Sequence, residues 1–289
     1  MTMTRRSFIG QVAAGTILSS AMGRAAGRKI DKLGLQLYTV RTEMEKDFEG
    51  TLAKVAGAGY QEVEFAGYFN QDPKKVRAIL DRHKLVAPSA HIDYATVETK
   101  LAQAIDASHV IGHKFLVNPW IDEEARKQPD IWKRVAATFN KAGETCHKAG
   151  IQFAYHNHHF EFVPVDGVRP FDVLLKECDS SLVKMELDLC WIAVAKVDPL
   201  TYFQRYPGRF PLVHVKGLKK IPEGQPPVPF DQAIPNITEV GSSDIIDWKR
   251  IFAHASQAGI QHYFVEHDQP ASPFDSVRTS AQYLHQLTF

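Results

Sequence analysis

The sequence predicts an α/β fold, a single-domain (β/α)8 barrel of the TIM type, from three observations. Eight short apolar stretches alternate with eight stretches of helical periodicity between residues 33 and 287. The length of 289 residues and the hydrophobic content of 44% suit one domain of this kind. The first apolar stretch runs into Gln36-Leu-Tyr-Thr-Val-Arg41, without the glycine-rich phosphate loop that a doubly wound sheet is expected to carry there.

The first 26 residues form a separate segment, which we interpret as a twin-arginine (Tat) export signal. Thr4-Arg-Arg-Ser-Phe-Ile9 has the twin-arginine pattern, and a moderately apolar run from Phe8 to Met22 leads to small residues before Ala25 and Ala26. That run is too short and too rich in Gly and Ser to span a membrane. We therefore expect residues 1–26 to be removed and residues 27–289 to form a periplasmic barrel without a membrane span.

The predicted strands are short and rich in apolar or β-branched residues, as expected for strands that are covered on both faces. In chain order they are Leu33–Tyr38, Glu62–Phe65, Val86–Ala90, Phe115–Val117, Ile151–Tyr155, Val183–Leu187, Pro211–Val215 and Tyr263–Val265.

The predicted helices carry apolar residues at three- and four-residue spacing. Their apolar positions are Phe48-Leu52-Val55, Val76-Ile79-Leu80, Leu101-Ile105, Ile131-Val135-Phe139, Phe171-Leu174-Leu175, Leu200-Phe203, Ile246-Ile251-Phe252 and Val277-Tyr283-Leu287. Gly59, Gly150 and Gly259 follow three of these helices and are typical of left-handed helix stops. A long segment from Gly217 to Ser243 contains five prolines, so we expect it to lack a helix and to act as a lid or substrate wall.

Ligand-type side chains follow the last four predicted strands. The fifth strand runs into three histidines and a glutamate, starting at His156, and the next strands end at Asp188, His214 and Glu266. Because strand C-termini of a barrel face one bowl, these side chains are expected to converge there. Nitrogen and carboxylate donors suit Mn²⁺, Zn²⁺, Co²⁺ or Fe²⁺, with Mg²⁺ also considered, better than Ca²⁺. The sequence therefore predicts one divalent metal held by these four residues.

Other polar residues at the strand ends are candidates for substrate binding or for structural pairs. We expect Arg41, Glu64 and His91 to contact the substrate, and Trp191 to form a wall for a sugar face or part of the core. For Glu64, the roles of base, support for a ligand and structural ion pair all remain open. The three cysteines, at positions 146, 178 and 190, lack the short spacing of a disulfide framework. We expect buried free thiols, although one bridged pair remains open.

The chain resembles the xylose-isomerase-like sugar phosphate isomerase/epimerase superfamily over essentially all of residues 30–289. Each matching string is weak alone, but their order and spacing together are specific for the superfamily. They are Gln36-Leu-Tyr-Thr-Val-Arg41, Val63-Glu64, His156-Asn-His158, Asp188-Leu-Cys-Trp191, His214-Val-Lys216, Ile246-Asp-Trp248 and Val265-Glu266.

The resemblance implies a metal held by Glu, Asp, His and Glu from the fifth to eighth strands. Asp188, His214 and Glu266 match the last three, and His156 stands where the family usually has the first glutamate. In the family's epimerases the two glutamates share the proton transfers, whereas a metal-bound imidazole shuttles protons poorly. The substitution therefore favours a one-base reaction, with Glu266, His158 or His91 as the base and Lys216 stabilising an enolate oxygen.

Three functions follow as expectations. The first is a metal-dependent sugar isomerase or epimerase, the second a lyase or dehydratase acting on 3-keto-glycosides or other oxidised sugars, and the third a non-catalytic sugar-binding subunit. Endonuclease IV of the same superfamily needs a second histidine where this chain has Trp191, and the net charge of +1 gives no general case for nucleic acid binding. The expected partner is a small carbohydrate; self-association into a homo-oligomer is compatible with the sequence.

Overall fold

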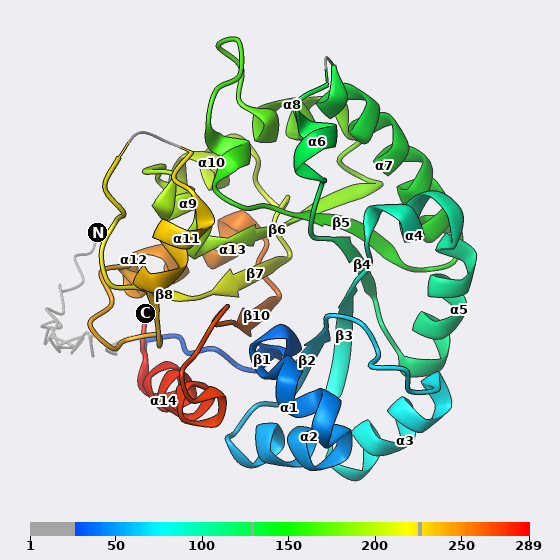
Figure 1. Ribbon diagram of the computed structural model, residues 1–289, viewed down its shortest axis with the longest axis vertical. Coiled ribbons are helices and arrows are strands. Elements are labelled where there is room, and N and C mark those ends of the chain that lie inside the picture. Colours follow the sequence, from blue (N-terminus) through cyan, green and yellow to red (C-terminus); the bar gives the residue numbers. More distant parts are fainter. Residues whose placement is uncertain (1–26, 129, 225–226) are drawn as a thin grey trace, which may run out of the picture.

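Eight parallel strands close into a barrel in the computed structural model, which describes residues 27–128, 130–224 and 227–289 (Figure 1). Neighbouring strands follow the order β1-β10-β7-β6-β5-β4-β3-β2, so β1 pairs with both β2 and β10. The predicted (β/α)8 TIM barrel is therefore confirmed. The barrel strands are β1 (Leu33–Gln36), β2 (Glu62–Phe65), β3 (Val86–His91), β4 (Phe115–Asn118), β5 (Gln152–His156), β6 (Val183–Asp188), β7 (Leu212–Val215) and β10 (His262–Val265).

A ring of helices surrounds the barrel, as Figure 1 shows. They are α1 (Arg41–Lys46), α2 (Phe48–Gly57), α3 (Pro73–Arg82), α4 (Tyr94–Thr99), α5 (Leu101–Ile111), α6 (Glu123–Arg126), α7 (Ile131–Lys148), α8 (Pro170–Glu177), α9 (Leu189–Val194), α10 (Pro199–Arg205), α11 (Phe230–Ala233), α12 (Trp248–Phe252), α13 (Ala255–Ala258) and α14 (Pro273–Gln286), with the 3-10 turns η1 (Leu37–Val40), η2 (Phe160–Phe162) and η3 (Ile234–Asn236). The predicted first strand extended to Tyr38, but Leu37 and Tyr38 belong to η1, because the Gln36 side chain accepts a hydrogen bond from the Tyr38 N–H and turns the chain.

The core lies between the strands and the apolar faces of the helices. Helix α7 illustrates the pattern, because Val135, Phe139 and Cys146 lie on one face and are buried. The ring of Phe139 packs against Phe153 and Tyr155 of β5 at centroid distances of 5.2 and 5.3 Å. Burying one such side chain contributes about 1.5–3 kcal/mol to folding. This packing holds β5 in place and with it the histidines that follow the strand.

The expected glycine stops are present, since Gly59, Gly150 and Gly259 all have positive φ. At Gly259 the tight geometry adds a second reason for glycine, because a Cβ would lie 2.8 Å from the Cα of Gly208. The turn after α13 therefore approaches the segment before β7 closely, and it directs the chain into β10. At the other end of the chain, Arg28 and Phe289 exchange two backbone hydrogen bonds, which tie the ends of the described barrel together.

The segment from Gly217 to Ser243 is more ordered than the sequence predicts. It contains the short antiparallel pair β8 (Gly217–Leu218) and β9 (Ile237–Thr238), the one-turn helix α11 and the turn η3. The expectation of no helix here is wrong: Pro229 stands just before α11, a position where the missing N–H of proline does not interrupt the helix. Leu218, Ile237 and Ala233 are buried against Trp191, so the segment packs on α9.

All three cysteines are free and buried, in agreement with the expectation of free thiols. Within the described ranges, none of the helices combines the length and apolar character needed to cross a membrane. The export signal predicted for residues 1–26 lies outside the described residues.

Candidate metal centre

Four side chains from four adjacent strands meet at the C-terminal mouth of the barrel. His156 is the last residue of β5 and Asp188 the last of β6, His214 is in β7, and Glu266 directly follows β10. The strand register places Asp188 directly opposite His214. One ligand atom from each of the four lies within 4.8 Å of the others, and all four residues are buried. The structure therefore brings the sequence-predicted ligands together, while metal binding itself stays a prediction.

The distances within this group, called the upper cluster below, suit a common cation. His156 Nε2 lies 3.3 Å from Asp188 Oδ2, and His214 Nδ1 lies 3.6 Å from the same oxygen and 2.8 Å from Glu266 Oε2. In a tetrahedral site with bonds of about 2.0–2.2 Å, neighbouring ligand atoms are separated by roughly 3.3–3.6 Å. Nδ1 of His214 is buried and faces the carboxylates of Asp188 and Glu266. Two nitrogens and two carboxylate oxygens facing one point fit a transition-metal ion.

Electrostatics keeps the donor atoms of the upper cluster ready to bind. Burial, followed by the nearby His214 ring, lowers the pKa of His156 to about 4, so this imidazole is neutral near pH 7. Burial disfavours ionised Asp188, but Lys216 and His156 outweigh it and hold the pKa of the carboxyl well below its usual range. A neutral imidazole and an ionised carboxylate are the forms that bind metals.

Asp188 has a second, structural role. Its Oδ1 accepts hydrogen bonds from the N–H groups of Cys190 and Trp191 at 2.9 and 2.8 Å, which caps the N-terminus of α9. Its own N–H donates to Oδ1 of Asn157 at 3.0 Å. The capping bonds orient the carboxylate, so that Oδ2 is the oxygen facing His156, His214 and Lys216.

Lys216 links the upper cluster to a further carboxylate. Its buried Nζ lies 3.0 Å from Asp188 Oδ2, 2.7 Å from Glu266 Oε2 and 3.1 Å from Asp268 Oδ2. Burial disfavours the ammonium, but Asp188 and Asp268 raise the pKa of Lys216 well above its usual value. Burial raises the pKa of Asp268 to about 6. The sequence alone assigns Asp268 no role, because its contact with Lys216 depends on barrel closure.

A second group of donors, called the deep cluster below, lies on the other side of the His214 ring. It consists of Glu64, His91, Glu186 and Nε2 of His214, again with ligand atoms within 4.8 Å of one another. Glu64 and His91, predicted to contact substrate, are placed in this cluster, and Glu64 and Glu186 are fully buried. Sequence reasoning gave Glu186 no role, because only the pairing of β6 with β7 places it beside His214.

The carboxylates and histidines of the deep cluster shift one another's protonation. Burial, then the Glu64 carboxylate, raises the pKa of Glu186 to about 7. Burial opposes the charged form of His91, but Glu64 and Glu186 raise its pKa to about 9. The cluster therefore carries both negative and positive charge within the barrel.

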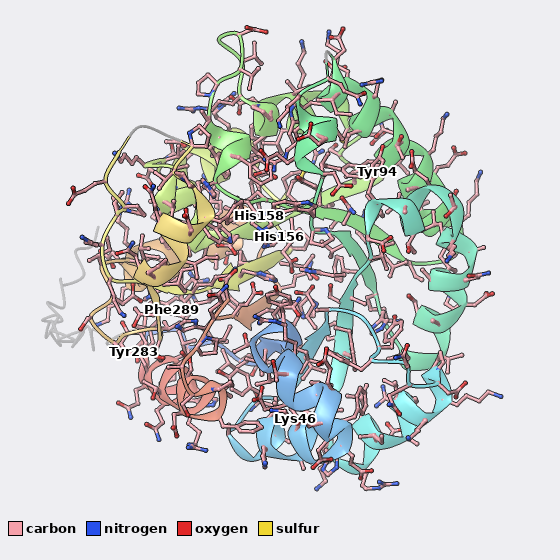
Figure 2. All side chains as sticks on the ribbon, in the orientation of Figure 1. Lys46, Tyr94, His156, His158, Tyr283 and Phe289 are labelled. Atoms are coloured by element: carbon pink, nitrogen blue, oxygen red, sulfur yellow. The ribbon has the colours of Figure 1, made fainter. Side chains whose placement is uncertain are left out.

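Aromatic rings cover one side of the mouth. Figure 2 labels His156 and His158 close together inside the ring of helices, and their ring centroids are 5.0 Å apart. Trp191 is fully buried and packs against His158, His159 and Phe230 at centroid distances of 5.6, 5.0 and 5.2 Å. Its ring also lies 5.4 Å from Lys216 Nζ. The sequence left open whether Trp191 forms a wall for a sugar or part of the core. In the structure, Phe230 of α11 packs on its ring, which is fully buried.

Two other predicted site residues differ in their surroundings. Arg41, at the start of α1, donates to the backbone carbonyl oxygens of Tyr38 and Asp268 at 2.7 and 2.9 Å. These bonds tie η1 to the segment after β10, next to the Asp268 side chain that contacts Lys216. His158 makes no hydrogen bond through its buried Nδ1, and burial followed by His156 lowers its pKa well below the usual value. His158 is therefore neutral and has an unbonded ring nitrogen facing the site, but its buried surroundings make it a weak base.

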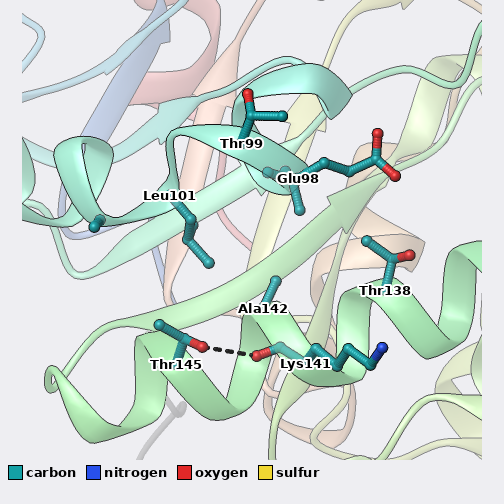
Figure 3. A pocket seen from close by; sticks show the side chains of 9 residues that line it. Glu98, Thr99, Leu101, Thr138, Lys141, Ala142 and Thr145 are labelled. Atoms are coloured by element: carbon teal, nitrogen blue, oxygen red, sulfur yellow. Dashed lines mark hydrogen bonds between the residues drawn. The ribbon is translucent and has the colours of Figure 1, made fainter.

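A separate surface groove lies far from these clusters, on the outer helices. Figure 3 shows side chains of α4, α5 and α7 that line it. Its volume is about 470 Å³. It is lined by Val97, Glu98, Thr99, Leu101, Ala102, Thr138, Lys141, Ala142 and Thr145. Neither cluster contributes to it, so it gives no support to the chemistry at the barrel mouth.

Comparison with known proteins places this architecture among relatives that are named as enzymes. The inosose dehydratase of Lacticaseibacillus casei is 25% identical over 268 residues, which cover 83% of this chain and 89% of that protein. The inosose dehydratase of Clostridium tetani is 22% identical over 273 residues, covering 84% and 90%.

Solved structures show the same fold. A sugar phosphate isomerase/epimerase from Parabacteroides distasonis superposes with a TM-score of 0.73 at 26% identity, covering 92% of this chain and 98% of that one. An IOLI protein with a bound zinc atom superposes with a TM-score of 0.66 at 12% identity, covering 87% and 95%, and shows the fold alone. The sequence profile described as "Xylose isomerase-like TIM barrel" matches residues 52–287. The chain therefore belongs to the xylose isomerase-like TIM barrel family.

Proposed function

We propose that this protein is a divalent-metal-dependent lyase that removes a proton next to the carbonyl of an oxidised sugar and expels a hydroxyl or other substituent from the adjacent carbon. The observation that carries the proposal is the composition of the upper cluster. It has one carboxylate beyond the aspartate, Glu266, and a neutral histidine, His156, in place of a second glutamate. A single carboxylate can start an elimination by removing one proton, whereas symmetric epimerisation needs two opposed bases.

The donor set of the upper cluster fits a divalent metal. His156, Asp188, His214 through Nδ1 and Glu266 would hold it. Such an ion, when bound, polarises a carbonyl or hydroxyl oxygen as a Lewis acid and favours the enolate form.

The chain's own residues account for the proton transfers. Burial raises the pKa of Glu266, but Lys216 and His214 outweigh this effect and hold the pKa below its usual range. Glu266 is therefore ionised and can accept the proton from carbon. The electron pair of the broken C–H bond forms a carbon–carbon double bond, and the C–O bond to the leaving group breaks. Asp268, with a pKa of about 6, can give its proton to the departing oxygen, so that water or an alcohol leaves. The ammonium group of Lys216 stabilises the negative charge that develops on the substrate oxygen.

The alternative base is His158. It is neutral and unpartnered at Nδ1, and it adjoins His156. Glu266→Gln and His158→Gln distinguish the two assignments. If His158 is the base, His158→Gln abolishes hydrogen exchange at the substrate carbon while the bound metal stays at the wild-type level. If Glu266 is the base, His158→Gln leaves exchange largely intact.

A sugar isomerase or epimerase is the second candidate, favoured by the 26% identity to a structure named sugar phosphate isomerase/epimerase. The first proton transfer is shared, and the outcomes separate afterwards. Reprotonation at a neighbouring carbon gives an isomer, whereas loss of the β-substituent gives an unsaturated ketone.

The test uses the full chain, stripped of metal by a chelator and reloaded with Mn²⁺, Zn²⁺, Co²⁺ or Mg²⁺. Keto sugars, keto cyclitols and 3-keto-glycosides are incubated in heavy water, and products are identified by mass spectrometry. We expect metal-dependent loss of water or aglycone. An isomer of unchanged mass supports the second candidate. Binding without any hydrogen exchange on carbon contradicts both enzymatic functions and supports a sugar-binding subunit.

We also propose export to the periplasm, which rests on the twin-arginine pattern at Arg5 and Arg6. Expression of the full chain followed by cell fractionation checks this. We expect the wild type in the periplasm and an Arg5→Lys/Arg6→Lys variant inside the cell. Equal distribution of the two proteins would contradict export by this route.

A further inference from the structure

We propose that the deep cluster is a second divalent-cation site, built from Glu64, His91, Glu186 and Nε2 of His214. His214 then binds one cation on each side of its ring. This goes beyond the proposed function, which uses only the upper cluster, and it does not depend on that function being correct.

The geometry of the deep cluster matches a four-coordinate site. Glu64 Oε2 lies 3.2 Å from His91 Nε2 and 2.7 Å from His214 Nε2, and Glu186 Oε2 lies 2.8 Å from His91 Nε2 and 3.4 Å from His214 Nε2. Each residue uses the same atom in both of its contacts. The four atoms therefore form a ring. Two of its edges, 3.2 and 3.4 Å, are close to the roughly 3.3 Å that separates donors on an ion with bonds of about 2.0–2.1 Å, and the other two, 2.7 and 2.8 Å, are hydrogen-bond lengths that a bound ion would lengthen.

The two buried carboxylates of the deep cluster require positive charge beside them, which either a cation or protons on the histidines can supply. Two carboxylates are buried side by side, and both form their ion pairs with the two histidines, which are neutral unless protonated. Burying an uncompensated carboxylate costs several kcal/mol, on the order of the penalty known for buried ions. One divalent cation or two protons can balance the pair. With a cation, both histidines keep the neutral form in which they bind metals.

Neighbouring side chains orient the Glu64 carboxylate through hydrogen bonds, whereas one oxygen of the Glu186 carboxylate has no hydrogen-bond partner. Gln36 Nε2 donates to Glu64 Oε2 at 2.7 Å, and Ser89 Oγ donates to Glu64 Oε1 at 2.5 Å. Such outer hydrogen bonds orient a carboxylate for metal binding. Glu186 Oε1 is buried without any hydrogen-bond partner, although buried carboxylate oxygens are rarely left unbonded. A bound cation, coordinated by Glu186 through one or both oxygens, accounts for this oxygen.

His214 connects the two sites. Its Nδ1 faces Asp188 and Glu266 of the upper cluster, and its Nε2 faces Glu64 and Glu186 of the deep cluster. If both sites were filled, each ring nitrogen of His214 would face one cation, and the ring would give up its N–H proton to the buffer.

The experiment measures stoichiometry and needs no substrate. The metal-free full chain is dialysed against Zn²⁺ in the presence of a weak competing chelator, and bound zinc is measured by elemental analysis. We expect two ions per wild-type chain and one per chain in Glu186→Gln. His156→Gln, which alters only the upper cluster, should also bind one, and the double variant should bind none.

The matched control is Glu62→Gln. Glu62 is another buried glutamate bonded to a histidine, His262, at 2.7 Å, but it lies at the opposite end of β2 from the mouth and outside both clusters. We expect this variant to bind two ions. Far-UV circular dichroism confirms folding, and Glu64→Gln replaces Glu186→Gln if that variant does not fold.

The proposal is overturned if the wild type binds one ion and Glu186→Gln binds that ion with unchanged affinity, because the deep cluster is then balanced by protons. Replacement of zinc by Co²⁺ gives an independent count of the bound ions, since two tetrahedral ions should give about twice the visible absorption of one. Two ions without sugar turnover would contradict the proposed function and leave the deep site intact. One bound ion together with sugar turnover would support the proposed function and contradict the deep site.

Discussion

At the scale of single residues, the environment of each carboxylate and histidine decides its chemistry. Glu266 and Asp268 are two residues apart and both contact Lys216 Nζ, yet the pKa of Glu266 is lowered and that of Asp268 is raised to about 6. Glu266 also faces His214, whereas Asp268 does not share that second positive partner. Two carboxylates separated in this way are suited to act as base and acid.

The first prediction concerns Asp268 as the acid. Its acidic form is lost as pH rises through about 6, so the rate of elimination should fall above that pH. Asp268→Asn should lower kcat by about 10²–10⁴-fold, the usual contribution of a general acid. The pH profile of kcat and the metal content check this together. Unchanged kcat, or loss of metal from the variant, would assign Asp268 a structural role instead.

The second prediction concerns His113, a buried histidine outside both clusters. Burial lowers its pKa to about 4, and its Nδ1 bonds to the carbonyl oxygen of Ala87. The unfolded chain takes up this proton near the ordinary value of 6.5 and the folded chain only near 4. The contribution of His113 to the free energy of unfolding should therefore be fully present above pH 6.5. It should be lost as the pH falls from 6.5 to 4, which lowers the free energy of unfolding by up to about 3 kcal/mol.

His113→Gln should flatten that part of the stability curve. Urea unfolding at pH 7.5 and 5.0 measures the difference, with the exposed His147→Gln as control. An equal loss of stability at low pH in both variants would show that His113 is not the residue responsible.

At the scale of elements, helix ends and strand ends share residues. Asp188 is both the last residue of β6 and the N-cap of α9, with one oxygen for each task. Strand β7 likewise presents two nitrogens of His214 to different partners. The sequence predicts most strands to within a residue or two, because their apolar runs are distinct. It failed on the 217–243 segment, where Pro229 stands at the start of α11 instead of excluding a helix.

The third prediction separates the two tasks of Asp188. Asp188→Asn keeps an oxygen for the cap but loses the charge that a metal needs, and Asp188→Ala loses both. We expect both variants to lose the upper ion. In the metal-free state Asp188→Ala should be less stable than Asp188→Asn by about 1 kcal/mol, the usual worth of a helix cap. Chemical unfolding measures this, and equal stability would show that the cap is not significant.

At the scale of the whole molecule, barrel closure decides which residues meet. Strands β5, β6, β7 and β10 contribute one ligand each to the upper cluster, so an ion bound there joins four strands. Because the unfolded chain has no such site, metal binding should stabilise the native barrel as a unit.

The fourth prediction follows from this linkage. Metal at about 100 times its Kd should stabilise the fold by about 2.7 kcal/mol, and this corresponds to a rise in Tm on the order of 5–10 °C for a chain of this size. Calorimetry with and without a chelator measures the rise. His156→Ala, which removes one upper ligand, should reduce it, whereas an identical Tm in chelator and in metal would argue against any bound ion.

The sequence by itself determined the barrel and the ligand-type residues at its strand ends, because apolar periodicity and position along a strand are local properties. Tertiary structure decided the rest. The pairing of β6 with β7 placed Glu186 and Asp188 on two sides of one histidine. Closure of the barrel brought Glu64 of β2 and His91 of β3, which the sequence predicts as substrate contacts, into the deep cluster beside the same histidine. Such contacts depend on the stagger between strands and on which way each side chain points, and these are set only when the barrel closes and its interior packs.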